Sequence, residues 1–236
     1  MKIAVFADVH GNIPALKAIF EQIKKDNVDE IICLGDLVAI GPKPKECLDF
    51  VINNNITLVP GNHELYYSKG TYIDENMADE EKAHQDWVAS LLGEEYKEYI
   101  NSLPVEIERN INGKTFAFKH FLTKSEDSLF PFEEAIVVKT GDPVRFVKLQ
   151  KADYTFIGHE HRPFTAREDN KMIVDVGSSG CTKNDITYYT LIEVEKDVKI
   201  TKKEVLFDRK KLIADIQNVD YPDRDFLAKV FFGVEI

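Results

Sequence analysis

The first 61 residues alternate between short apolar runs and amphipathic segments, and this order limits the folds that the chain can adopt. Apolar runs at 2–7, 30–35 and 56–61 predict buried strands. Between them, apolar residues recur at helical spacing from Ile13 to Ile23, and a second helix is predicted over 44–53. A strand, helix, strand, helix, strand order predicts a parallel sheet with helices on its faces.

Each of these three strands ends in polar side chains that can bind a metal. Asp8 and His10 follow the first strand, Asp36 follows the second, and Asn62 and His63 follow the third. The carboxyl ends of neighbouring parallel strands meet at one sheet edge, which is where ligands bind in such folds. An acid and an imidazole are costly to bury unless they are paired or bound to a metal. We therefore expect this edge to face a metal ion.

The rest of the chain continues the pattern after a polar, helical insertion at about 64–104. Residues 105–120 predict a hairpin, with Asn112-Gly113 as a type I′ turn and His120 at its end. A strand over 154–161 ends in His159-Glu160-His161, and two more strands follow it. Asp142-Pro143 predicts the start of a helix, and the C-terminal helices at about 209–232 contain a break at Asp220 and Pro222. We expect one domain over residues 1–236.

The histidines are distributed unevenly along the chain. Five of the six stand at or just after the end of a predicted strand: His10, His63, His120, His159 and His161. The sixth, His84, lies in the helical insertion, where we expect it on the surface. With Asp8, Asp36 and Asn62, the five make eight candidate ligands, more than one ion takes. Two ions about 4 Å apart, bridged by a carboxylate, would use such a set. Oxygen and imidazole donors without a thiolate suit Mn²⁺, Fe or Zn²⁺, and Mn²⁺ is the first expectation.

The composition excludes several classes of partner. A net charge of −11 disfavours a stable complex with duplex nucleic acid, because phosphate contacts require a basic surface. A small phosphate ester stays open, since bound metal reverses the local sign of charge. The sequence shows neither an apolar run of membrane-spanning length nor a signal peptide. Three cysteines, expected as small buried residues, predict a reducing, cytoplasmic location. A homo-oligomer stays open.

Five blocks, "DVHGN", "GDLVAIGP", "GNHE", "FKHF" and "GHEH", resemble the motif series of the calcineurin-like metallophosphoesterases from residue 1 to about 180. The early "GDLVAIGPKP", the tryptophan-bearing insertion and "SLP" at 102–104 resemble most the branch of bacterial and archaeal small phosphodiesterases and diadenosine polyphosphate hydrolases. The resemblance implies an α/β fold, a four-layer α/β/β/α sandwich of two mixed sheets with a helical insertion. It also implies a first metal on Asp8, His10 and His161, a second on Asn62, His120 and His159, and Asp36 bridging the two.

The chain departs from the family pattern at three places. Phe121 stands where a small residue is common, Asp175-Val176 replaces Asn-Pro, and Ala39 replaces the aspartate that partners a catalytic histidine in some relatives. These departures leave the ligand set intact and concern the fit of the substrate.

The resulting functional prediction is hydrolysis of small phosphodiesters or dinucleoside polyphosphates by in-line attack of a metal-bridging hydroxide. His63 and Asn62 would contact the substrate phosphate, with His63 either donating a proton to the leaving group or stabilising charge. Arg162 is either a phosphate contact or a solvated loop cation, and Lys119 and Lys124 are expected on the surface. The alternatives are a phosphomonoesterase, including a protein phosphatase, and a non-catalytic scaffold of the same fold.

Overall fold

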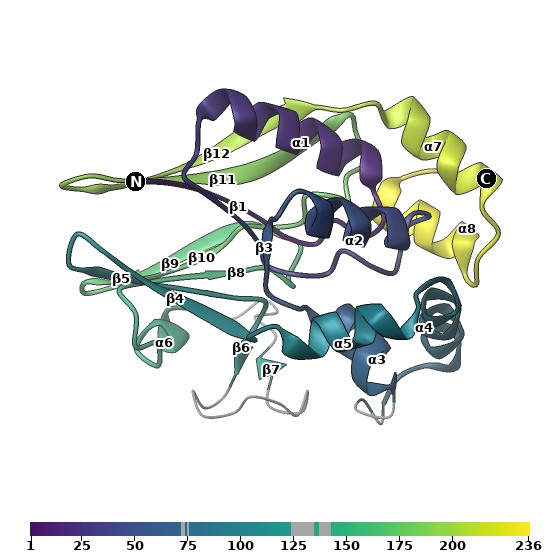
Figure 1. Ribbon diagram of the computed structural model, residues 1–236, viewed down its shortest axis with the longest axis horizontal. Helices are drawn as coiled ribbons and strands as arrows, with labels where there is room; N and C mark the ends of the chain where they lie inside the picture. Colours follow the sequence, from purple (N-terminus) through teal and green to yellow (C-terminus); the bar gives the residue numbers. More distant parts are fainter. Residues whose placement is uncertain (72–73, 75, 124–134, 137–142) are drawn as a thin grey trace.

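The computed structural model describes residues 1–236 except 72–73, 75, 124–134 and 137–142. Its first sheet has the strand order β12-β11-β1-β2-β3 (Figure 1). As predicted, β1 (Lys2–Phe6), β2 (Glu30–Cys33) and β3 (Thr57–Leu58) run parallel, although β3 is shorter than the predicted strand. β11 (Ile186–Val194) pairs antiparallel with β1 and forms a hairpin with β12 (Val198–Leu206), so the sheet is mixed.

The second sheet has the order β4-β5-β8-β10-β9. β4 (Glu106–Ile111) and β5 (Lys114–Lys119) form the predicted hairpin, and its turn residues Asn112 and Gly113 have φ of 53° and 77°, as a type I′ turn requires. The remaining strands are β8 (Tyr154–Ile157), β9 (Phe164–Glu168) and β10 (Lys171–Asp175). β8 runs parallel to both β5 and β10. A separate short pair joins β6 (Leu122–Thr123) to β7 (Ala135–Ile136).

The two sheets pack face to face and carry helices on their outer faces (Figure 1). Side chains such as Val5 and Phe118 fill the space between the sheets. α1 (Ile13–Asp26) and α2 (Pro44–Asn53) cover the outer face of the first sheet, where Leu16 and Leu48 join Phe6 in one buried cluster. α6 (Val144–Val147) packs on the outer face of the second sheet. The four-layer sandwich is therefore confirmed, while Asp142, where we predicted the start of α6, lies outside the described residues.

Two groups of helices lie at the carboxyl end of the parallel strands. The insertion forms α3 (Asn62–Lys69), α4 (Asp79–Leu91) and α5 (Glu94–Ser102). The C-terminal group contains α7 (Arg209–Asn218), α8 (Arg224–Leu227) and the π-helical turn η3 (Ala228–Phe232). The chain leaves the helical path at 219–223, at the predicted break. α4 and α8 lie near each other in Figure 1, and residues of both line one pocket. Among the described residues, helices of sufficient length and apolarity to cross a membrane are absent.

Candidate metal centre

The loops that follow β1 and β2 run side by side and are joined by backbone hydrogen bonds. The N–H of Asp8 donates to the carbonyl of Gly35, and the N–H of His10 donates to the carbonyl of Asp36, both at 2.9 Å. The loop after β3 packs equally closely against the loop after β2. A Cβ atom added to Gly35 would lie only 2.2 Å from the backbone nitrogen of Gly61. Glycine is required at position 35, where φ is 90°. The strand ends therefore bring their polar side chains to one point.

Five candidate ligands have a left-handed backbone that non-glycine residues rarely adopt. Their φ angles are 54° at Asp8, 46° at His10, 52° at Asp36, 75° at His159 and 59° at His161. Each such residue costs on the order of 1–3 kcal/mol, and residues of this kind cluster at functional sites. The strain turns each side chain away from the direction that an extended strand would give it.

A first group of donor atoms forms around His10. Its Nε2 lies 2.9 Å from Nε2 of His161. Oδ1 of Asp8 lies 3.9 Å from the same His10 nitrogen and 3.6 Å from that of His161. Oδ2 of Asp36 is 3.9 Å from Nε2 of His10. These atoms are the ones that the resemblance assigns to the first metal, together with the bridging carboxylate.

A second group forms around Asn62 and shares the same carboxylate. Oδ1 of Asn62 lies 3.1 Å from Nε2 of His120 and 3.0 Å from Nδ1 of His159. Oδ2 of Asp36 lies 3.2 Å from Nε2 of His120. Nδ1 of His120 contacts the carbonyl of Leu34 at 2.5 Å, which leaves Nε2 to face the group. Asp36 thus stands between the two donor groups.

Burial keeps three of the imidazoles in the form that binds metal. Desolvation lowers the pKa of His10 well below its usual value, that of His159 to about 3 and that of His161 to about 4. A histidine must be neutral to bind a metal ion, so these three rings are already in the binding form at neutral pH.

His120 and Asp36 behave as an ion pair in the absence of metal. Burial lowers the pKa of His120, but the carboxylate of Asp36 outweighs it and raises the pKa to about 10. Burial likewise opposes ionisation of Asp36, and the neighbouring His120 and His63 hold its pKa well below the usual value. A divalent cation would replace the proton of His120 as the positive partner of Asp36. This set of buried and half-buried nitrogen and oxygen donors fits divalent metal ions.

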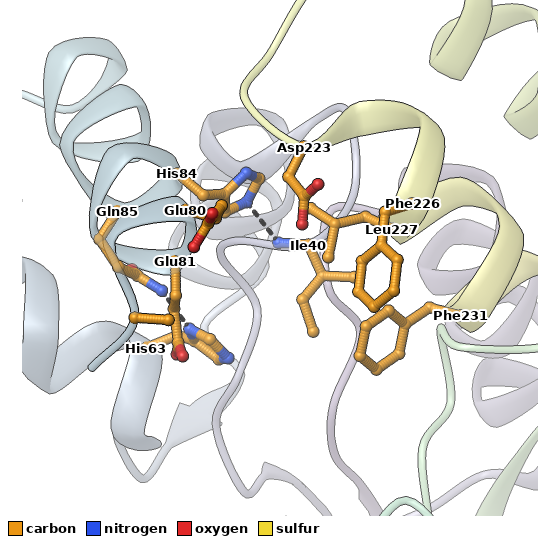
Figure 2. Close-up of a pocket in the computed structure, with 11 residues that line it drawn as sticks. Ile40, His63, Glu80, Glu81, His84, Gln85, Asp223, Phe226, Leu227 and Phe231 are labelled. Atoms are coloured by element: carbon orange, nitrogen blue, oxygen red, sulfur yellow. Dashed lines mark hydrogen bonds between the residues drawn. The ribbon is translucent and has the colours of Figure 1, made fainter. Parts of the chain in front are cut away.

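His63 stands at the margin of the metal groups and has a different environment. Its backbone N–H donates to Oδ1 of Asp36 at 3.0 Å, and its ring Nε2 lies 4.0 Å from Oδ2. Nε2 of Gln85 lies 2.6 Å from Nδ1 of His63 (Figure 2). With the amide donating to Nδ1, the ring proton is on Nε2, facing Asp36. His63 is close enough to His10 and Asp36 to form a third group of potential ligands.

Three contributors to the site were missed by the sequence analysis. Glu64 is fully buried, and its carboxylate accepts hydrogen bonds from the backbone N–H groups of Asp36, Leu37, Val38 and Gly61 at 2.7–3.2 Å. Burial raises its pKa. Glu64 thereby fixes the loop that carries Asp36, and its place in "GNHE" was the available signal. Gln85 positions His63, but nothing in the helical pattern distinguished it from its neighbours.

Cys181 is the third missed contributor. Its Sγ and the ring nitrogens of His10 and His161 all lie within 4.8 Å of one another, so the fold brings a sulfur atom beside the first donor group. Burial raises the pKa of this thiol well above its usual value. Cys33 and Cys47 are buried residues, as expected, whereas Cys181 is only half-buried.

Two expectations of surface position are also wrong. His84 is only 3% exposed: its Nε2 accepts a hydrogen bond from the N–H of Ile40 at 2.7 Å, and its Nδ1 contacts the carbonyl of Pro222 at 3.1 Å. Lys119 is buried and pairs with Glu106 at 3.0 Å, while Lys124 lies outside the described residues. Arg162 is exposed next to His161, and its contact with phosphate stays a prediction.

Comparisons with known proteins concern the family and the fold. The calcineurin-like phosphoesterase superfamily domain matches residues 1–197. An uncharacterized protein of Methanocaldococcus jannaschii is 30% identical over 244 residues, which cover 94% of each chain. A symmetrical bis(5'-nucleosyl)-tetraphosphatase of Psychromonas ingrahamii is 42% identical over 66 residues, only 26% of this chain and 24% of that one.

The solved structures extend the likeness over the whole chain. A hypothetical protein of Pyrococcus horikoshii OT3 superposes with a TM-score of 0.80 at 20% sequence identity, covering 100% of this chain and 99% of that one. At this identity the superposition concerns the fold. The fold gathers the expected donor side chains at its strand ends. Together, the domain match and the relative aligned over 94% of the chain show that this protein belongs to the calcineurin-like phosphoesterase superfamily.

Proposed function

We propose that this protein is a hydrolase of small phosphodiesters or dinucleoside polyphosphates that uses two divalent metal ions. The position of Asp36 carries the proposal, since one carboxylate oxygen is 3.2 Å from Nε2 of His120 and 3.9 Å from Nε2 of His10. Asp8, His10 and His161 would hold one ion, and Asn62, His120 and His159 the other. When bound, such ions neutralise phosphate charge and lower the pKa of a bound water to about 7.

The remaining chemistry falls to residues at the margin of the metal groups. His63 has its proton on Nε2 when Gln85 donates to Nδ1, so it can donate to a phosphate oxygen or to the departing oxygen. The Asn62 amide nitrogen is a second candidate donor. Glu64 and the strained loops hold these groups in place before substrate arrives, so little reorganisation is needed during the reaction.

The pocket beside His63 favours a diester over a monoester. It has a volume of about 490 Å³ and lies between α4 and α8–η3, so a second organic group has a place to bind. The partial match to tetraphosphatases supports the same preference. A phosphomonoesterase remains the alternative, because the metal groups do not depend on this pocket. The intact donor set argues against a non-catalytic scaffold.

A metal-dependent substrate panel tests the proposal. The protein is stripped with chelator, reloaded with Mn²⁺, Fe²⁺ or Zn²⁺, and assayed on bis-p-nitrophenyl phosphate, p-nitrophenyl phosphate, diadenosine tetraphosphate and a cyclic nucleotide. We expect no hydrolysis without metal, recovery with Mn²⁺, and faster diester than monoester hydrolysis. We also expect a lower melting temperature without metal, because ions that bind only the folded state stabilise it. Full activity of the metal-free protein would contradict the two-metal proposal, and a preference for the monoester would favour the alternative.

A further inference from the structure

The pocket beside the metal centre has two chemically different walls (Figure 2). One wall comes from α4 and carries Glu80, Glu81, His84 and Gln85. The other is apolar and is formed by Ile40, Phe226, Leu227 and Phe231, with Asp223 at its margin. His63 lines the pocket as well as facing Asp36, so the pocket opens next to the proposed site of chemistry. A group bound there would be attached to the reacting phosphate.

The walls are held in place by a residue that takes no part in the metal groups. His84 connects them, because its Nε2 accepts from the N–H of Ile40 and its Nδ1 contacts the carbonyl of Pro222 in the C-terminal segment. Ile40 has φ of 61°, a conformation that is a genuine outlier for a β-branched residue. The cost of this strain shows that the rest of the fold fixes the position of Ile40. The pocket is therefore formed before a ligand arrives.

The charged side chains that line the pocket are all acidic. Glu80, Glu81 and Asp223 make no salt bridge within the described part of the chain, and the lining contains no lysine or arginine. A second phosphate group would be repelled here, which favours the phosphodiesters of the proposed function over the dinucleoside polyphosphates. A cation would be attracted by the carboxylates and also by the faces of aromatic rings. Phe226 supplies such a ring, since it is 58% exposed and lines the pocket.

We propose that this pocket binds a cationic organic group, an ammonium carried on a short chain, that is esterified to the phosphate at the metal centre. The proposal rests on the proposed function and names its substrate class: phosphodiesters with one aminoalkyl or quaternary-ammonium ester. Gln85 adds a polar group to this wall: its side chain lines the pocket, its amide nitrogen contacts Nδ1 of His63, and its buried Oε1 has no hydrogen-bond partner.

Isosteric substrates separate charge from size. p-Nitrophenyl phosphocholine is compared with p-nitrophenyl 3,3-dimethylbutyl phosphate, in which carbon replaces the charged nitrogen. A second pair, the p-nitrophenyl diesters with 6-ammoniohexyl and heptyl groups, tests a longer reach. All four release nitrophenolate, so the departing group is constant. We expect kcat/KM to be about tenfold higher for the cation in at least one pair, mainly through KM, and the difference to shrink at high salt.

Variants locate the preference in the pocket. The double variant Glu80→Gln/Glu81→Gln and the single variant Asp223→Asn should reduce the preference for the cation. Asp86→Asn, an exposed acid on the same helix but outside the pocket, should leave it unchanged. Hydrolysis of bis-p-nitrophenyl phosphate reports whether each variant is folded and active. If that substrate is hydrolysed but the neutral ester of both pairs is as good as the cation, this proposal is overturned. If no diester is hydrolysed with any metal, the proposed function itself fails.

Discussion

His63 and His84 line the same pocket, and their surroundings show how differently one residue type is used. Both ring nitrogens of His84 contact backbone groups, and burial lowers its pKa to about 4. His63 has one nitrogen positioned by Gln85, while the other faces the carboxylate of Asp36. A histidine whose polar atoms are all satisfied by the backbone holds the fold together. One that leaves an atom facing charged groups is available for chemistry.

The largest expected effect comes from the carboxylate at the centre of the reactive region. Asp36→Asn removes the charge shared by both donor groups. Because a bound metal stabilises the transition state by several kcal/mol, we expect kcat to fall by at least about 10³-fold. Metal content, measured by mass spectrometry, should fall at both sites. His161→Ala should have a smaller effect because it touches one group. His84→Gln is the matched control and should retain its metal. Normal metal content in Asp36→Asn would contradict the bridging position.

The next effect tests the chemistry assigned to His63. A proton donor contributes about 10²–10⁴-fold when the leaving group is a poor one. His63→Ala should therefore lose much more activity on an alkyl or nucleotide ester than on a nitrophenyl ester, with metal content near normal. Equal losses on both substrates would assign His63 to stabilisation of phosphate charge. Loss of metal would instead show that His63 binds a metal ion together with His10 and Asp36.

Gln85 should have a smaller effect that acts through His63. Gln85→Leu removes one hydrogen bond of the kind that contributes about 0.5–1.5 kcal/mol, so we expect a loss of about 2- to 10-fold in kcat with little change in metal content. Gln85→Glu places a carboxylate on Nδ1, which favours the charged imidazole and should move the limb of the pH–rate profile that depends on His63 to higher pH. An unchanged profile in Gln85→Glu would show that Gln85 does not position the reacting group.

The comparison also explains how far the sequence could predict the structure. Periodicity located the strands and helices because burial of apolar side chains repeats locally, as in α1 and the β4–β5 hairpin. The convergence of the donor side chains was predicted because each follows a strand end, and parallel strand ends converge. The surroundings of His84 could not be predicted, since its partners Ile40 and Pro222 are 44 and 138 residues away. The same holds for Cys181, which the fold brings beside His10 from a distant segment. Local patterns carry no information on such pairings.

The last expected effect concerns stability at His84 rather than activity. Its pKa is about 4 in the folded protein and about 6.5 when unfolded, so the unfolded state binds the additional proton between these values. The contribution of neutral His84 is complete above pH 6.5 and is lost as the pH falls toward 4. At pH 5 the loss is about 2 kcal/mol.

The test is urea unfolding of metal-free wild type and His84→Gln at pH 7.5 and pH 5.0. Other buried histidines titrate in both proteins, so the difference between their pH slopes isolates His84. We expect the variant to be less stable at pH 7.5 but to lose less stability on acidification. Equal declines would mean that His84 carries its charge without disturbing the contacts to Ile40 and Pro222, and the contrast with His63 would then no longer hold.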